Sequence, residues 1–216
     1  MANKNFNNQK INNNGFNFID LGLPSGTLWA TANVGANKPS DYGLYFQWGD
    51  VKGYTPDHVG LNKDKKAFEW TDYKWYESGS TADNSIKFKK YTTPGAILEL
   101  EDDAAHVNMG GDWHMPSPEQ IQELIDNTTS TWTKQDGVNG RLFTSKKDAS
   151  KTIFIPAAGD AWGGSILNSG DFGDVWSSAL STDGVNGGQN LYFLSGGVDL
   201  GSDGRYVGFS VRGVLG

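Results

Sequence analysis

The sequence predicts an α+β domain with mixed or antiparallel sheets, and three observations indicate it. Glycine (29 residues) and aromatic residues are abundant, a composition that favours strands and turns over a helical protein. Helical periodicity with capping signals is confined to the middle of the chain. Short apolar blocks of strand length, separated by turn residues, lie on both sides of it. The expected order is a few strands, two helices, and a second set of strands with long Gly-rich loops.

The folded domain is expected to span residues 16–216, after an Asn-rich tail at residues 1–15. A tail of this composition is typical of disorder. The alternative is an arm for homo-oligomerisation or for attachment to other virion proteins, gripping through Phe6, Ile11, Phe16 and Phe18. The tail lacks the basic-then-apolar order of a secretory signal. We therefore expect a protein that works inside a cell or is assembled into a virion, or a cell-surface or extracellular protein whose export signal is missing from this chain.

Three strands are expected in the first part of the domain, at residues 18–22, 27–35 and 42–49. The second alternates between apolar and polar positions, and the third is dense in aromatic residues that suit cross-strand packing. Residues 50–93 follow as a long irregular segment rich in Trp and Tyr. We expect these aromatic side chains to pin the loop to the body, with sugar binding as the alternative.

Two helices are expected next, at residues 98–107 and 117–127. In the second, Ser117 is suited to the N-cap, Pro118 to the first helical position, and Gln120 to a capping box. An apolar stripe follows at Ile121, Leu124 and Ile125. Residues 141–145 and 151–155 are then expected to pair as a hairpin.

The C-terminal part of the chain is predicted to be a rigid frame that presents small polar residues, which other residues could replace. Its expected strands are residues 152–159, 175–179, 190–195 and 206–212. Between them lie segments made almost wholly of Gly, Ser, Asn and Asp, which are expected to be turns and surface because they cannot supply a core. This layout suits a binding surface.

Composition excludes several classes of function. The chain has no cysteine, so disulfides, thiol catalysis and thiolate metal sites are excluded. Its net charge of -7 argues against nucleic acid and anionic membranes as partners. No stretch is apolar enough for membrane insertion.

Several separate motifs lie in order along the chain, at residues 20–31, 33–36, 42–49, 110–117, 154–159, 176–178 and 205–212. Together, from about residue 18 to residue 214, they resemble one family, the Fibrobacter succinogenes major paralogous domain found in Bacteroidetes and their phages. That family is similar to the C-type-lectin-like fold and to its formylglycine-generating-enzyme branch. The resemblance therefore implies a C-type-lectin-like domain, while leaving the biochemistry open, because fold does not fix function.

The C-terminal half also resembles the variable proteins of diversity-generating retroelements, in which adenine-directed mutagenesis rewrites chosen codons. This resemblance implies that residues reachable from Asn codons mark variable positions; the alternative is that they are ordinary turn residues. The positions are Asn168, Asp171, Asp174, Ser181, Gly184, Gly197, Asp199, Gly201, Ser202, Asp203, Gly204 and Val207. The intervening frame residues stay large: Trp176, Leu191, Phe193 and Tyr206.

The expected ligand is a protein or glycan on a cell surface, held by exposed aromatic and apolar anchors. Period-two alternation sends Tyr192 and Leu194 to the ligand side if Leu191 and Phe193 face the core. Trp162 is a further anchor, with packing against a neighbouring loop as its alternative. The expected ligand-binding residues are Asp160, Trp162, Asn168, Asp171, Asp174, Ser181, Gln189, Tyr192, Leu194, Asp199, Ser202, Asp203 and Val207.

No cofactor and no metal are expected. Asp102, Asp103 and His106 have a spacing that could suit a metal, but charge on a helix surface is the preferred interpretation. Ca²⁺ is the alternative cofactor, because carboxylates recur in the C-terminal loops although no calcium-lectin triplet is present. The loop carboxylates are Asp171, Asp174, Asp183, Asp199 and Asp203.

Catalysis is not expected. The copper chemistry of formylglycine-generating enzymes needs cysteines, which this chain lacks, and no Gly-x-Ser-x-Gly nucleophile elbow occurs. Glu99, Glu101, Asp102 and Asp103 are adjacent in sequence and are expected to face solvent rather than form a glycosidase pair. An enzyme would need a cleft with convergent titratable groups whose pKa values are perturbed. The leading hypothesis is a phage receptor-binding protein; a bacterial adhesin and a structural virion decoration or assembly protein are the alternatives.

Overall fold

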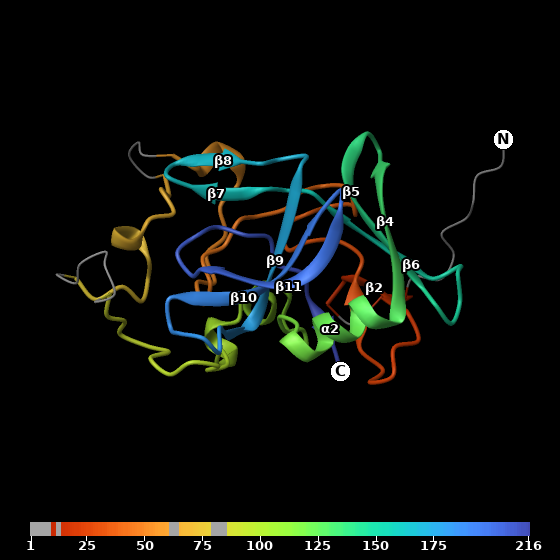
Figure 1. Cartoon of the computed structure of the whole chain (residues 1–216), viewed down its shortest axis with the longest axis horizontal. Helices are drawn as coiled ribbons and strands as arrows, with labels where there is room; N and C mark the ends of the chain where they lie inside the picture. Colours follow the sequence, from red (N-terminus) through yellow and green to blue (C-terminus); the bar gives the residue numbers. More distant parts are fainter. Residues whose placement is uncertain (1–9, 12–13, 61–64, 79–85) are drawn as a thin grey trace.

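The structure, a computed structural model, describes residues 10–11, 14–60, 65–78 and 86–216, with no side-chain description for Lys10 and Ile11. It confirms the α+β class: the described residues form four sheets and two α-helices (Figure 1). The mixture of short strands and long connections follows from the composition, because Gly, Asn and Asp repeatedly end the apolar runs.

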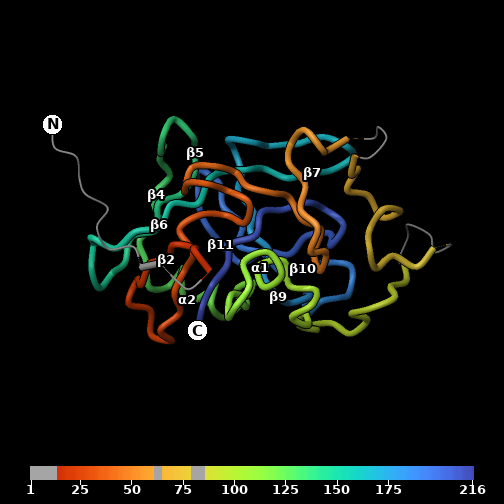
Figure 2. Tube along the Cα trace, turned by 180° about the vertical axis from the view of Figure 1, so that it is seen from behind, coloured from red at the N-terminus to blue at the C-terminus, as the bar shows by residue number. Residues whose placement is uncertain are grey.

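The two ends of the domain meet in one antiparallel sheet of order β1-β2-β3-β12 (Figure 2). Its strands are β1 (Lys10–Ile11), β2 (Asn17–Asp20), β3 (Leu28–Ala30) and β12 (Val214–Leu215). β1 belongs to the expected tail yet pairs with β2, and Asn14 Nδ2 donates to the Met109 carbonyl at 2.9 Å. The other tail residues, 1–9 and 12–13, including the expected grip residue Phe6, lie outside the described residues.

Residues 42–49 do not form the expected strand. In the described chain this segment makes isolated bridges, Tyr45 with Tyr54 and Phe46 with Phe209. Tyr45, Phe46, Gln47 and Trp48 are all buried, so successive side chains have no solvent face to alternate with. The segment crosses the core instead of lying in a sheet.

The long segment after it contains the 3-10 turns η1 (Pro56–His58) and η2 (Trp70–Asp72). The expectation that its aromatic residues pin the loop is confirmed. Tyr73 Oη donates to the Trp48 carbonyl at 2.8 Å, and Trp75 Nε1 donates to the Gly49 carbonyl at 3.0 Å. Residues 61–64 and 79–85 of this segment lie outside the described residues.

Both expected helices are present. The first is shorter than predicted, with a 3-10 turn η3 (Leu100–Asp102) followed by α1 (Ala104–Met109), because Asp103 caps it by accepting from the His106 amide at 2.9 Å. The second is α2 (Pro118–Asn127), and its capping box is confirmed. Ser117 Oγ accepts from the Gln120 amide at 3.2 Å, and Gln120 Oε1 accepts from the Ser117 amide at 2.9 Å.

A second sheet, of order β4-β5-β6, contains β4 (Thr128–Gln135), β5 (Val138–Ser145) and β6 (Thr152–Pro156). The β5–β6 pair confirms the predicted hairpin. β4 was not predicted, because its Thr- and Ser-rich sequence is half exposed and carries little apolar alternation. The short hairpin of β7 (Asp160–Trp162) and β8 (Ser165–Leu167) follows.

The C-terminal sheet has the order β11-β10-β9, with β9 (Phe172–Leu180), β10 (Gly187–Leu194) and β11 (Gly197–Gly204). β11 corrects the expectation that its Gly- and Asp-rich sequence would form turns, whereas none of its residues is buried, as expected for surface. It pairs with β10 along eight residues, and that pairing uses only backbone groups. Conversely, residues 206–212 make isolated bridges to three different segments and form no strand.

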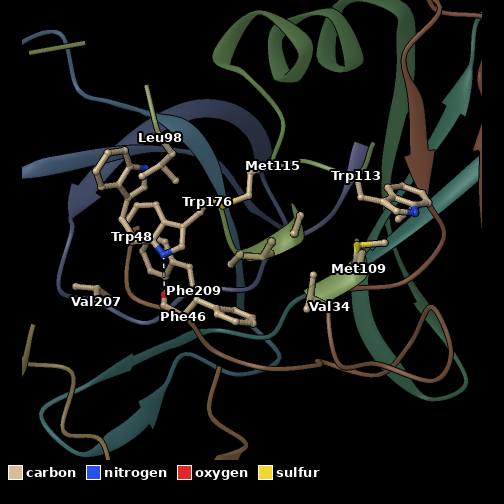
Figure 3. Close-up of a cluster of buried hydrophobic side chains, with 14 of the residues drawn as sticks. Val34, Phe46, Trp48, Leu98, Met109, Trp113, Met115, Trp176, Val207 and Phe209 are labelled. Carbon is tan, nitrogen blue, oxygen red and sulfur yellow. Dashed lines mark hydrogen bonds between the residues drawn. The ribbon is translucent and has the colours of Figure 1, made fainter. Parts of the chain in front are cut away.

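Two buried arginines hold residues 205–212 in the core, beside the cluster shown in Figure 3. Arg205 Nε donates to Tyr73 Oη at 2.6 Å, and its Nη1 and Nη2 donate to backbone carbonyls. Arg212 donates to Asn33 Oδ1 at 2.9 Å and to two further carbonyls. Trp176 Nε1 donates to the Phe46 carbonyl at 2.8 Å in the same cluster (Figure 3). These contacts give the segment a fixed path without sheet pairing.

Candidate cavity at the C-terminal sheet

A cavity of about 580 Å³ opens beside the C-terminal sheet and is lined by three parts of the structure. One wall is the sheet, another is the β7–β8 hairpin with the turn after it, and residues 206–209 complete it. In the view of Figure 1 the β7–β8 hairpin lies above the strands of this sheet. A cavity of this size suits a small molecule or a protruding side chain of a larger partner.

The sheet wall follows from the two-residue period of its strands. On β10, Leu191 and Phe193 are fully buried in the core, and Asn190 and Tyr192 line the cavity. The predicted alternation is therefore confirmed for Tyr192. Antiparallel pairing places Asp174 of β9 directly opposite Tyr192. The remaining sheet residues of the wall are Phe172, Gly201, Ser202 and Asp203.

The hairpin wall presents a carboxylate and an exposed indole. Asp160 and Trp162 lie two residues apart on β7, and both line the cavity together with Leu167. Trp162 is 50% exposed, so packing against a loop does not bury it. Asn168 adopts φ 56°, and its Nδ2 donates to Asp160 Oδ1 at 2.8 Å. The left-handed turn thus holds the carboxylate in place.

Residues 206–209 supply Tyr206, Val207 and Phe209. The neighbouring Arg205 fixes their position, as does Gln47, whose Nε2 donates to the Tyr206 carbonyl at 2.8 Å. The Tyr206 ring lies 4.3 Å from that of Trp70 in the long loop. Aromatic surface therefore comes from several elements that are distant in sequence.

Three carboxyl groups share this cavity, and the pKa of each is raised, chiefly by burial. Burial, followed by repulsion from Asp203 and Asp160, raises the pKa of Asp174 to about 8, against an opposing hydrogen bond from Asn190. Burial also raises the pKa of Asp160, with Asp203 adding to the rise. The pKa of Asp203 is raised by burial. At neutral pH, Asp174 is therefore largely protonated in the absence of a cation.

The structure gathers most, but not all, of the predicted ligand-binding residues at this cavity. Those that line it are Asp160, Trp162, Asn168, Asp174, Tyr192, Ser202, Asp203 and Val207. Ser181 lies at a smaller neighbouring hollow that shares Ser202 with the cavity. Outside the cavity lining are Asp171, Gln189, Leu194 and Asp199.

The four outlying residues have other environments. Gln189 points to the opposite side of β10 from Asn190, and its Nε2 donates to the Leu180 carbonyl at 2.9 Å. Leu194 is half-buried at the end of β10, while Asp171 and Asp199 are exposed. In sequence, these four residues look like the lining residues, because each lies in a polar turn or on an alternating strand. They differ from the lining residues only in how far along the turn or strand they lie.

Sequence reasoning missed Asn190, Phe172, Leu167 and Phe209 as site residues. Asn190 had a usable signal, because it lies two positions before Tyr192 on the same strand and so shares its face. Phe172 could not be found in this way, because its place depends on the β9–β10 register, which sets it opposite Leu194.

Of the acidic residues near α1, Glu99 and Glu101 are exposed as expected, but Asp102 and Asp103 are not, which corrects the expectation of charge on a helix surface. Asp102 and Asp103 are both buried. Asp102 Oδ1 lies 2.7 Å from Lys74 Nζ, and its Oδ2 lies 2.6 Å from Lys90 Nζ. Burial raises the pKa of Asp102, but hydrogen bonds from these lysines and Tyr91 outweigh that effect and hold the pKa below its ordinary value. Asp103 Oδ2 accepts from the Met115 amide at 2.8 Å.

In the described part of the chain, one group of three side chains has the spacing of a metal site: Glu99, Glu101 and Asp102, with ligand atoms within 4.8 Å of one another. Lys90 Nζ lies within hydrogen-bonding distance of all three, at 2.7, 3.4 and 2.6 Å respectively. A cation, the Lys90 ammonium, therefore already lies among these carboxylates. His106 is engaged elsewhere, with Nδ1 3.1 Å from the Trp113 carbonyl.

Comparison with protein-family models, curated proteins and solved structures found no match to this chain. Over the described residues, no helix combines the length and the apolar character needed to cross a bilayer.

Proposed function

We propose that this protein is a non-catalytic binding protein that recognises a protein or glycan on a cell surface through the C-terminal cavity. One observation carries the proposal: the cavity joins an exposed indole, Trp162, to a wall of aromatic and polar side chains. Partly exposed Trp and Tyr residues beside polar groups have the character of interface hot spots. No cofactor takes part in this binding, and Ca²⁺ is the alternative.

The same proposal includes the finer fold assignment, a C-type-lectin-like domain, and a role as a phage virion component. The motif resemblance supports both, because the family that it points to has a C-type-lectin-like fold and is found in Bacteroidetes and their phages. In this role the tail contacts other virion proteins or a second copy of the chain. A bacterial cell-surface adhesin and a structural decoration or assembly protein are the alternatives.

Diversification of the binding surface also belongs to the proposal. Six of the positions reachable from Asn codons line the cavity, and two more line the neighbouring hollow. Several of them lie on β11, an edge strand whose pairing depends on backbone groups. Side-chain exchange there leaves the pairing intact. The positions at the cavity are Asn168, Asp174, Gly201, Ser202, Asp203 and Val207.

Binding of the labelled protein to a panel of Bacteroidetes cells and to a glycan array tests this function. Trp162→Ala and Tyr192→Ala are expected to weaken binding by about tenfold or more, as hot-spot truncations do. Ile97→Ala and Leu100→Ala remove exposed apolar side chains outside the cavity and serve as controls. The proposal is contradicted if the control variants lose as much binding as the two cavity variants do, or if the folded protein binds no cell and no glycan.

A second candidate function, acid-assisted hydrolysis of a glycoside, is favoured by one observation. Asp174 has a pKa of about 8 and shares a cavity with two other carboxyl groups, which is the arrangement that an acid–base pair requires. Binding is preferred because Asp174 is only 6% exposed and is held by Asn190. Turnover of aryl glycosides that is abolished in Asp174→Asn would establish the enzyme instead.

A further inference from the structure

The cavity presents hydrogen-bond acceptors and keeps its amide donors occupied. Asn168 Nδ2 donates to Asp160, and Asn190 Nδ2 donates to Asp174 Oδ1 at 2.7 Å. Among the described residues that line the cavity, none is Lys, Arg or His. A ligand that satisfies the carboxylates and the amide oxygen of this lining must therefore bring donors of its own.

A buried acceptor in the wall still lacks a donor. Asn190 is 2% exposed, and no donor in the described part of the chain reaches its Oδ1. Because its Nδ2 faces the Asp174 carboxylate, Oδ1 faces away from it, beside Gly201. A Cβ on Gly201 would lie 2.9 Å from Asn190 Oδ1, so the glycine leaves space next to that oxygen. A buried acceptor without a partner costs free energy that a ligand donor would recover.

We propose that the cavity binds an organic cation, the guanidinium or ammonium group of a basic side chain on a protein partner. This inference rests on the proposed binding function and names the chemistry of its ligand. The cation carries several N–H donors, which suit the carboxylates of Asp160, Asp174 and Asp203 together with Asn190 Oδ1. The aromatic walls add to the attraction, because Trp and Tyr faces attract cations.

A metal ion fits this lining less well than an organic cation. Within the described chain, the group of acidic residues that brings three ligand atoms within 4.8 Å is the one beside Lys90, and the cavity carboxylates do not form such a group. They are spread over β7, β9 and β11 around a cavity of about 580 Å³. A guanidinium group with its alkyl stem can reach separated acceptors that one ion cannot.

The repulsion among the carboxyl groups points to the same ligand. Burial and the neighbouring carboxylates raise the pKa of Asp174 to about 8, and a bound cation would lower that pKa by favouring the ionised form. Binding of a permanently charged probe should therefore strengthen as pH rises through about 8. The other titratable groups facing Asp174 contribute in the same direction, since each is acidic: Asp160, Asp203, Tyr192 and Tyr206.

Titration of the full chain with N-acetyl-arginine amide at pH 9 and low ionic strength tests the inference, with the Trp162 indole N–H resonance as the readout. N-acetyl-lysine amide distinguishes ammonium from guanidinium, and N-acetyl-citrulline amide is the neutral isostere of arginine. We expect saturable binding of a cationic probe and at least tenfold weaker binding of citrulline, about the difference made by a charged hydrogen bond. Asp174→Asn should weaken binding by about tenfold to hundredfold. Asp112→Asn, an exposed charge outside the lining, should leave it unchanged.

Several results would overturn the inference. These are equal binding of citrulline and arginine, unchanged affinity in Asp174→Asn, or stoichiometric CaCl₂ binding that displaces the probe. Binding of neutral sugars in place of cations would make the cavity a glycan site, which removes this inference and leaves the proposed function standing. If Trp162→Ala and Tyr192→Ala bind cells as tightly as the wild type does, the proposed function itself is contradicted.

Discussion

The Asp174 carboxyl makes a sharp prediction about how stability depends on pH. This side chain is 6% exposed, faces the carboxyls of Asp160 and Asp203, and accepts a hydrogen bond from Asn190. Asp174→Asn keeps the shape of the side chain and an oxygen that can accept the same bond, while removing the charge. The difference in unfolding free energy between the variant and the wild type therefore reports the cost of that charge.

The sign follows from proton binding. The folded-state pKa of Asp174, about 8, lies above its ordinary value of 3.8, so the folded protein holds a proton that the unfolded chain has released between these pH values. Wild-type stability therefore falls as pH rises across this interval, and the loss is complete above about pH 8. At about 1.4 kcal/mol for each pH unit, the cost at pH 9 is on the order of 5 kcal/mol. Asp174→Asn does not incur this cost, because the amide does not ionise.

Urea denaturation at pH 4, 6 and 9, followed by tryptophan fluorescence, measures the difference. We expect Asp174→Asn to match the wild type near pH 4 and to exceed it progressively toward pH 9. Asp112→Asn, which also removes one negative charge but from an exposed position, controls for net charge. A difference that is the same at all three pH values, or that is largest at pH 4, would refute the reasoning. The variant should be more stable at pH 9 and yet bind the cationic probe more weakly, a combination that misfolding does not produce.

The remaining predictions concern the glycine beside Asn190 and a buried arginine. Gly201→Ala should weaken binding of N-acetyl-arginine amide by about tenfold, the scale of one added methyl in a pocket, because its Cβ would lie 2.9 Å from Asn190 Oδ1. Gly197→Ala on the same strand, with nothing within 4 Å of its Cβ, should leave the affinity unchanged in the same titration, and equal effects would contradict the assignment of that space. Arg212→Ala should lower the free energy of unfolding, measured in urea, by roughly 3 kcal/mol, because three buried acceptors lose the hydrogen bonds that Arg212 donates. A change near zero would show that the arginine is dispensable for stability.

Local patterns predicted the elements whose formation depends on neighbours in sequence. The α2 helix was predictable because Ser117, Pro118 and Gln120 satisfy its first turn before any tertiary contact forms. The β5–β6 hairpin and the faces of β10 followed from strand periodicity, which placed Tyr192 toward the ligand side. The same period would also have placed Asn190 there.

Long-range pairing decided the elements that sequence patterns misjudged. β11 is a strand because β10 offers it a complete row of backbone partners, although its own residues have weak strand propensity. Residues 206–212 have the alternation of a strand but follow the buried Arg205 and Arg212 instead. Asp102 and Asp103 looked like helix-surface charges and are buried, because Lys74, Lys90 and backbone amides satisfy them.

By itself, the sequence determined the α+β class, the capped helix, and the concentration of Gly and Ser toward the C-terminus. Only the tertiary structure decided that Asp160, Asp174 and Asp203 share one cavity, because they lie on three strands whose approach depends on register and on a hairpin folding back. The charge interaction that gives the cavity its chemistry is a property of distance in space. Residues far apart along the chain acquire it only when the fold removes the water between them.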